Sequence, residues 1–204
     1  MKSVGYSLST LLAISMFCSV ALAQQAATTS SSPRRVNFSG KTADAQENSP
    51  SLAQVVALDE CDPTTFNATL GPDFCKNVAL AALGYATTLS DLFLKAGEGK
   101  PDPGWDFEPD TVTMKEGATL SVVDLGGEPH TFTEVEQFGG GFLPVLNAPG
   151  ENTVRECADG FSNVEVARTR ILQGSHTQIT GLSKGEHLFQ CCNHPWMRVK
   201  VQVK

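Results

Sequence analysis

From Trp105 to the C-terminus, the chain is a succession of short segments in which β-branched and other apolar residues alternate with polar ones. Turn residues such as Gly117 and the pair Gly126-Gly127 separate these segments. Many short strands at this spacing are typical of a β-sandwich or barrel. We predict strands at 111–114, 119–124, 131–134, 164–171, 177–180, 187–191 and 198–203. The predicted fold class is therefore all-β, with one domain over residues 104–204.

Residues 138–163 interrupt this pattern. They contain three consecutive glycines, two prolines and Cys157, and they have no strand periodicity. We read them as a long loop inserted between strands, and loops of this length inside compact domains are often functional.

Residues 53–103 have a different pattern, which predicts a compact, disulfide-tied helical extension in front of the β domain. Two apolar segments, 53–58 and 78–83, lie on either side of a polar loop. The residues Thr-Leu-Ser-Asp at 88–91 resemble a capping box, which marks the start of a helix. The apolar residues that follow have helical spacing, and Gly97 is expected to lie near the end of this helix.

The first residues predict export. Residues 1–23 carry an early lysine, an apolar run and a final Ala-Leu-Ala, which is the anatomy of a signal peptide. Residues 24–52 are rich in Ser, Thr, Gln and Ala and predict a disordered tether. No later segment is apolar enough to span a bilayer. We expect an exported protein, periplasmic or extracellular, without an integral membrane segment in the mature chain.

The charge and the missing motifs exclude several classes of function. The net charge is −7, and it becomes −8 once residues 1–23, which hold one Lys and no acid, are removed. Nucleic-acid affinity comes largely from Lys and Arg on phosphates, so we expect no nucleic-acid partner. The sequence has no recognisable nucleophile with its base, no paired acids in a catalytic motif and no Gly-rich phosphate loop. We therefore expect no enzyme.

The cysteine count supplies the first specific clue. Export implies an oxidising compartment, in which paired thiols become disulfides. The mature chain keeps an odd number of cysteines, so at least one thiol is left for another use. These five residues are Cys61, Cys75, Cys157, Cys191 and Cys192.

A set of metal-binding side chains gathers near the C-terminus. Cys191, His194 and Met197 follow one another at intervals of three residues, and His130 lies upstream at the end of a Gly-Gly-Glu-Pro turn. Soft sulfur ligands combined with imidazole suit copper, and two His, one Cys and a weak axial Met form the blue-copper arrangement. We predict one type 1 copper ion held by these four residues.

The same residues resemble the plastocyanin/azurin-like cupredoxin family. The loop Cys-x-x-His-Pro-x-Met-Arg at 191–198 is most similar to that of the amicyanins, and the resemblance extends from Phe107 to Lys204. Further matches are Phe107-x-Pro109, Val112, Gly117, Val122, Pro129-His130 and Gly185-Glu186-His187-Leu188-Phe189-Gln190-Cys191. The resemblance implies a Greek-key β-sandwich, with His130, Cys191 and His194 as strong ligands and Met197 as the axial ligand. It also implies that His194 is partly exposed and passes electrons to a partner.

The chain departs from the family pattern in three places. Thr131 follows His130 where the family often has Asn, so the hydrogen bond that joins the two ligand loops is expected to differ. Residues 138–163 exceed the family minimum and are expected to shield the metal or to form a docking surface. Cys192 stands next to the predicted ligand.

Strand geometry separates the two adjacent cysteines. Neighbouring residues on a strand point to opposite faces, and only Cys191 has the three-residue spacing to His194. If Cys191 is a ligand, four cysteines remain, and four cysteines allow three pairings. We prefer Cys61 with Cys75 and Cys157 with Cys192. A structural disulfide at Cys191 and a dinuclear copper centre bridged by both cysteines are the weaker alternatives, and His176 and His187 are read as structural.

Three functions remain open. The first is a one-electron carrier that cycles between Cu(I) and Cu(II), acts as a monomer and meets a redox partner protein transiently. The second is a copper carrier or storage protein that delivers metal to a copper enzyme. The third is an interaction protein that keeps the fold but has lost copper.

Overall fold

The structure is a computed structural model that describes residues 52–76 and 86–204. The predicted signal peptide at 1–23, the predicted tether up to residue 51 and the apolar segment at 78–83 lie outside the described residues. Within the described part of the chain, no helix is long and apolar enough to cross a membrane.

One sheet of the sandwich has four strands in the order β2-β1-β4-β8. The central pair is parallel, with Val55 of one strand opposite Val122 of the other. The two outer strands are antiparallel to their neighbours. The strands are β1 (Leu52–Leu58), β2 (Asp106–Glu108), β4 (Thr119–Asp124) and β8 (His176–Ile179).

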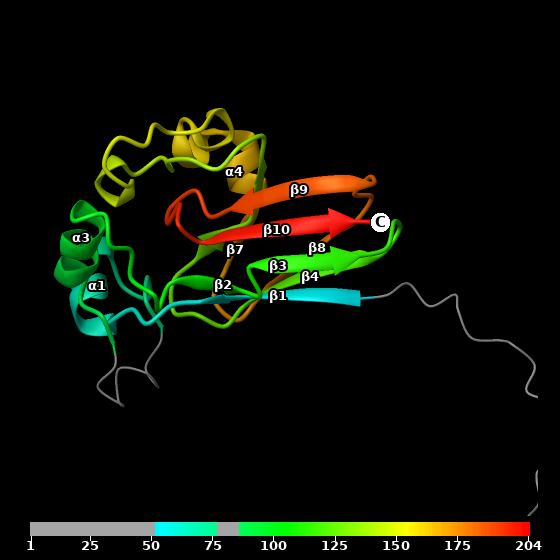
Figure 1. Cartoon of the computed structure of the whole chain (residues 1–204). Helices are drawn as coiled ribbons and strands as arrows, with labels where there is room; N and C mark the ends of the chain where they lie inside the picture. The colour runs from blue at the N-terminus through cyan, green and yellow to red at the C-terminus, as the bar shows by residue number, and fades with distance from the viewer. Residues whose placement is uncertain (1–51, 77–85) are drawn as a thin grey trace, which may run out of the picture. The chain divides into compact units, whose positions relative to one another are not determined.

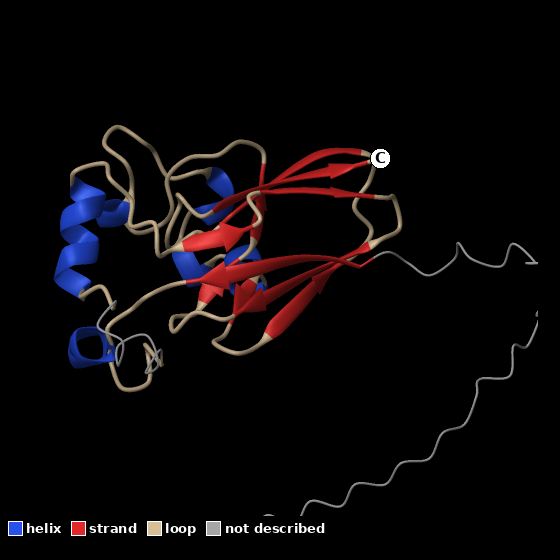
Figure 2. Cartoon of the chain, turned by 60° about the horizontal axis from the view of Figure 1, so that its bottom comes forward, coloured by secondary structure: helices blue, strands red, loops and turns tan. Residues whose placement is uncertain are grey.

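The second sheet has the order β3-β10-β9-β6, and its strand β10 is parallel to β3 and antiparallel to β9. Its strands are β3 (Thr111–Met114), β10 (Arg198–Val203), β9 (Gly185–Gln190) and β6 (Thr133–Val135). A two-stranded sheet of β5 (His130–Thr131) and β7 (Arg170–Ile171) completes the strand pairing. Figure 2 shows the two main sheets facing each other. The predicted all-β sandwich is confirmed as a fold class.

The core lies between the sheets because the strands bury alternate side chains. In β10, for example, Val199, Val201 and Val203 are buried and the residues between them are more exposed. Phe189, in the adjacent strand β9, pairs with Val199, and its ring stacks on that of Phe132 with 4.5 Å between centroids. Such rings supply much of the apolar area that holds a sandwich together.

The helical interpretation of 53–58 is wrong, because this segment is strand β1. Val55 and Ala57 are buried and alternate with more exposed residues, which is the period of a strand. A short apolar run cannot be assigned to helix or strand from its own sequence. Here the long-range pairing of β1 with β4 and β2 makes the segment a strand. The first sheet therefore takes one of its two central strands, β1, from the predicted extension.

The predicted strand at 164–171 is also mostly wrong. Helix α4 covers Val164–Arg168, and the strand β7 is confined to Arg170–Ile171. The helix begins here because the side chain of Asn163 accepts a hydrogen bond from the backbone N–H of Glu165 at 2.9 Å. The preceding insertion, 138–163, contains only the short 3-10 turns η1 (Pro144–Leu146), η2 (Arg155–Cys157) and η3 (Gly160–Ser162).

Two helices of the predicted extension lie at one end of the sandwich. They are α1 (Pro63–Leu70) and α3 (Leu89–Gly97). The hydroxyl of Thr88 accepts the backbone N–H of Asp91 at 3.2 Å, which confirms the predicted helix start. Figure 1 shows both helices at the same end of the sandwich as the loop between β9 and β10.

Candidate metal centre

The loop that joins β9 to β10 is closed by its own backbone. The N–H of Cys191 donates to the carbonyl of Met197 at 3.0 Å, and the N–H of Met197 donates to the carbonyl of His194 at 3.0 Å. Antiparallel pairing of Phe189 with Val199 fixes the two ends of the loop. The sequence spacing of three residues therefore places Cys191, His194 and Met197 on one compact turn.

The structure brings three of the four predicted ligands together. The Sγ atom of Cys191 lies 3.8 Å from Nδ1 of His130 and 3.9 Å from Nδ1 of His194. All three ligand atoms lie within 4.8 Å of one another, and all three residues are buried. His130 reaches this point because β5 pairs with β7 and sets it opposite Ile171.

These separations fit ligands of a single ion. Nitrogen and sulfur atoms bonded to one first-row metal at about 2.1 and 2.3 Å, with about 120° between them, lie about 3.8 Å apart. A tetrahedral angle would bring them to about 3.6 Å. The two Cys191 distances of 3.8 and 3.9 Å are therefore in the range expected for ligands of one ion.

Met197 is fully buried beside this group. Its backbone holds both ends of the ligand loop through the hydrogen bonds to Cys191 and His194. Its role as the axial ligand stays a prediction from the spacing.

Thr131 joins the two ligand loops. Its hydroxyl accepts the backbone N–H of Cys192 at 2.7 Å, and its own N–H points at Sγ of Cys191 at 3.5 Å. The sequence predicted a different link here, because Thr stands in place of Asn. In the structure, the hydroxyl and the backbone N–H of Thr131 connect the two ligand loops.

The thiol of Cys191 is strongly acidified. Burial alone would raise its pKa, but hydrogen bonds and charge interactions with His130 and His194 outweigh burial and hold the pKa well below the usual range. A thiolate is the form that binds metal. Among the described residues, Cys191 is the free cysteine.

Both histidines are backed by buried carboxylates that the sequence analysis did not identify. Nε2 of His130 lies 2.9 Å from Oδ2 of Asp59, and Nε2 of His194 lies 3.4 Å from Oε2 of Glu128. Asp59 also accepts the backbone N–H of Glu128 at 2.9 Å, and Glu128 accepts the indole N–H of Trp105 at 2.7 Å. Carboxylates behind histidine ligands fix the tautomer and the ring orientation. Each ring is thereby set with Nδ1 toward Cys191.

The electrostatics of this outer group follow from burial and pairing. Burial opposes ionisation of Asp59, but its hydrogen bond and charge interaction with His130 outweigh burial and lower its pKa. For Glu128, burial dominates and raises the pKa. Burial also raises the pKa of the neighbouring Asp124 to about 7. The only indication of these carboxylates in the sequence is that Glu128 stands two positions before His130.

The expectation that His194 is partly exposed is wrong. The side chain is only 4% exposed. Trp196 packs against it with ring centroids 5.5 Å apart, and Trp105 lies at 6.2 Å. Trp196 in turn donates its indole N–H to the carbonyl of Trp105 at 3.1 Å. Trp105, just before β2, and Trp196, in the ligand loop, therefore cover His194, which the resemblance placed at the surface.

The predicted disulfides are confirmed. Cys61 is bonded to Cys75, and Cys157 is bonded to Cys192. Cys191 belongs to the main core, whereas Cys192 belongs to a second apolar cluster formed with the insertion. The two adjacent residues, which directly follow β9, thus face opposite sides, as the alternation along a strand predicts.

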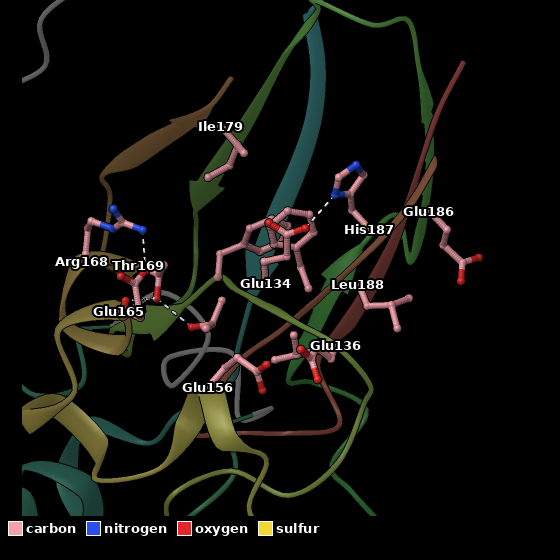
Figure 3. Close-up of a pocket in the computed structure, with 14 residues that line it drawn as sticks. Glu134, Glu136, Glu156, Glu165, Arg168, Thr169, Ile179, Glu186, His187 and Leu188 are labelled. Carbon is pink, nitrogen blue, oxygen red and sulfur yellow. Dashed lines mark hydrogen bonds and ion pairs between the residues drawn. The ribbon is translucent and has the colours of Figure 1, made fainter. Parts of the chain in front are cut away.

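The two remaining histidines lie apart from the site. His176 begins β8 and is exposed. His187 bonds to Glu134 at 2.6 Å and to the carbonyl of Ser183 at 2.8 Å. Figure 3 shows His187 pointing toward Glu134 along a groove that also carries Glu136, Glu156, Glu165 and Glu186. This groove contains none of the predicted ligands.

Comparison with known proteins gives only remote similarities. The chain matches no protein-family model and no curated protein. A purple cupredoxin from Nitrosopumilus maritimus is 12% identical with a TM-score of 0.39, over 74% of this chain and 99% of that chain. A reduced amicyanin variant is 18% identical with a TM-score of 0.30, over 48% of this chain and 73% of that chain. A Cu(I) form of another amicyanin variant is 17% identical with a TM-score of 0.31, again over 48% of this chain and 73% of that chain.

Proposed function

We propose that the protein is an exported type 1 copper protein that carries one electron at a time. His130, Cys191 and His194 would hold the ion, and Met197 would be its axial ligand. The observation that carries this proposal is the convergence of one free, acidified thiol and two imidazole nitrogens at separations near 3.8 Å in a buried pocket. A bound copper ion would supply a reversible Cu(I)/Cu(II) couple.

The chain itself supports such a role by being rigid around the ligands. β9 and β10 hold Cys191 and Met197 at the ends of the loop, and Thr131 ties this loop to β5. Asp59 and Glu128 hold the two imidazoles in place. A site that is fixed before the metal binds moves little when the electron arrives, because a rigid scaffold resists relaxation of the ligands.

Burial favours an electron carrier over a copper-delivery protein. A delivery protein needs ligands that a recipient can reach, whereas Cys191 and His130 are fully buried and His194 nearly so. We extend the proposal to a transient redox partner protein, a monomeric chain and a periplasmic or extracellular location. These parts rest on the sequence patterns described above.

The test is the absorption and EPR spectrum of the oxidised, copper-loaded protein. We expect an intense visible charge-transfer band and a narrow copper hyperfine splitting, because a copper–thiolate bond produces both. Cys191→Ser should lose both signals.

The matched control is the double variant Cys157→Ser/Cys192→Ser, which removes the neighbouring disulfide and should keep both signals. A colourless protein, or one that binds zinc in place of copper, would contradict the proposed function. Rapid loss of copper to a chelator would favour the delivery protein.

A further inference from the structure

A cavity of about 280 Å³ lies beside the candidate metal centre, between the two helices at the end of the sandwich and the insertion. Twelve of its sixteen lining residues are apolar, among them Phe66, Leu92 and Phe142. The other four lining residues are Glu128, Arg170, Asn193 and His194. The cavity therefore has mainly apolar walls and contacts His194, which is otherwise buried.

The cavity is bordered by exposed apolar side chains. Leu70 of α1 and Leu143, Val145 and Phe161 of the insertion all line it, and they are between 37% and 50% exposed. Clustered exposed apolar residues on a soluble protein mark sites of interaction, whereas scattered ones need no explanation. These four are clustered because segments far apart in the sequence bring them to one place.

The polar residues of the lining are Glu128, Arg170, Asn193 and His194, and the guanidinium of Arg170 lies over the ring of Phe161 at 5.0 Å from its centroid. Oδ1 of Asn193 is buried and has no hydrogen-bond partner among the described residues, while its amide donates to the carbonyl of Pro129 at 3.5 Å. Glu128 contributes a carboxylate. A buried acceptor without a partner is costly, so the Oδ1 atom of Asn193 favours a ligand that brings a donor.

The size of the cavity limits the ligand. An apolar cavity of about 150 Å³ holds benzene. The volume of about 280 Å³ therefore suits one or two aromatic rings.

We propose that this cavity binds a small aromatic alcohol of one or two rings. The rings would lie among the phenylalanine and leucine side chains, and the hydroxyl would donate to Asn193 or Glu128. A ligand held in this way contacts His194 directly. The site requires no metal, so it can be tested separately from the proposed copper function.

The experiment titrates the mature protein, with and without copper, against 2-naphthol and 2-methoxynaphthalene and follows binding by ligand-observed NMR. The two probes have the same rings, but only 2-naphthol can donate a hydrogen bond. We expect 2-naphthol to bind about tenfold more tightly, in line with one hydrogen bond to a buried acceptor.

Two substitutions locate the binding site. Leu143→Trp places a larger side chain in the lining and should weaken 2-naphthol binding at least tenfold. Leu94→Trp is the matched control, because Leu94 is exposed on α3 and does not line the cavity. Circular dichroism of both variants checks that they are folded. Absence of 2-naphthol binding, equal binding of the two probes, or unchanged binding in a folded Leu143→Trp protein would each overturn the proposal.

Discussion

Replacing Asp59 by Asn tests whether the buried carboxylate organises the metal centre before any metal is bound. Oδ2 of Asp59 lies 2.9 Å from both the backbone N–H of Glu128 and Nε2 of His130, and Oδ1 accepts the N–H of Cys61 at 3.2 Å. An asparagine keeps one acceptor oxygen and turns an NH₂ group toward the remaining donors. At least one buried N–H group then loses its partner.

The size of the effect follows from these contacts. An unpaired buried donor costs about 1–3 kcal/mol, and loss of one member of a buried ion pair costs about 3–5 kcal/mol. Since Asn keeps part of the hydrogen bonding, we expect the free energy of unfolding of the metal-free protein to fall by about 2–4 kcal/mol. Loss of a carboxylate behind a histidine ligand should also weaken copper binding about 10–100-fold.

Urea denaturation of the metal-free protein measures the first effect, and competition with a copper chelator measures the second. Asp110→Asn is the matched control, because Asp110 is exposed. A variant with unchanged stability and unchanged copper affinity would refute the idea that Asp59 positions His130. A loss of stability without a loss of affinity would assign Asp59 to folding alone.

Three further outcomes are expected. Cys157→Ala/Cys192→Ala should lower the free energy of unfolding by about 3–4 kcal/mol, because the bond closes a loop with a sequence separation of 35; guanidinium denaturation measures this change. Asp102 has a lowered pKa because the hydrogen bonds from Lys95, the N–H of Gly104 and Thr87 outweigh its burial. The stability that it contributes should therefore be present above about pH 4 and lost as the pH falls through the lowered pKa, so that wild type and Asp102→Asn converge in acid urea melts. Thr131→Val should cost about 1–2 kcal/mol, because it leaves the N–H of Cys192 without its acceptor, and Thr131→Ser should cost less.

Each of these outcomes has a clear contradiction. An unchanged free energy of unfolding in Cys157→Ala/Cys192→Ala would show that the insertion keeps its position without the disulfide. A constant difference between wild type and Asp102→Asn from neutral to acid pH would mean that ionised Asp102 is not stabilising. Equal stabilities of the Val and Ser variants of Thr131 would show that the hydroxyl does not join the two ligand loops.

The sequence was informative wherever local spacing determines structure. The predicted strands at 111–114, 119–124 and 198–203 match the observed strands, because alternation and flanking turn residues specify them locally. The distinction between Cys191 and Cys192 followed from strand geometry and the spacing to His194, and both disulfides agreed with it.

One error was local, because the N-cap at Asn163 starts a helix where a strand was predicted, and the other errors arose where distant segments decide the outcome. Residues 53–58 form a strand only because β2 and β4 pair with them. Asp59 and His130 are 71 positions apart in the sequence, so no local pattern predicts their contact. His194 is covered by Trp105, which lies far upstream of the ligand loop. Burial of a ligand by a remote segment cannot be read from the spacing of the ligands.

The position of β1 in its sheet determines where the protein can be shortened. Because β1 lies between β2 and β4, a chain that begins at residue 104 would leave both strands without a neighbour on that side. The backbone groups of β4 would form a bare edge beside buried Leu120 and Val122, and such edges promote association between molecules. The same deletion would remove Asp59. A protein that keeps this sheet closed and the carboxylate behind His130 therefore requires the chain from about Leu52 onward, even though all four predicted ligands lie beyond residue 129.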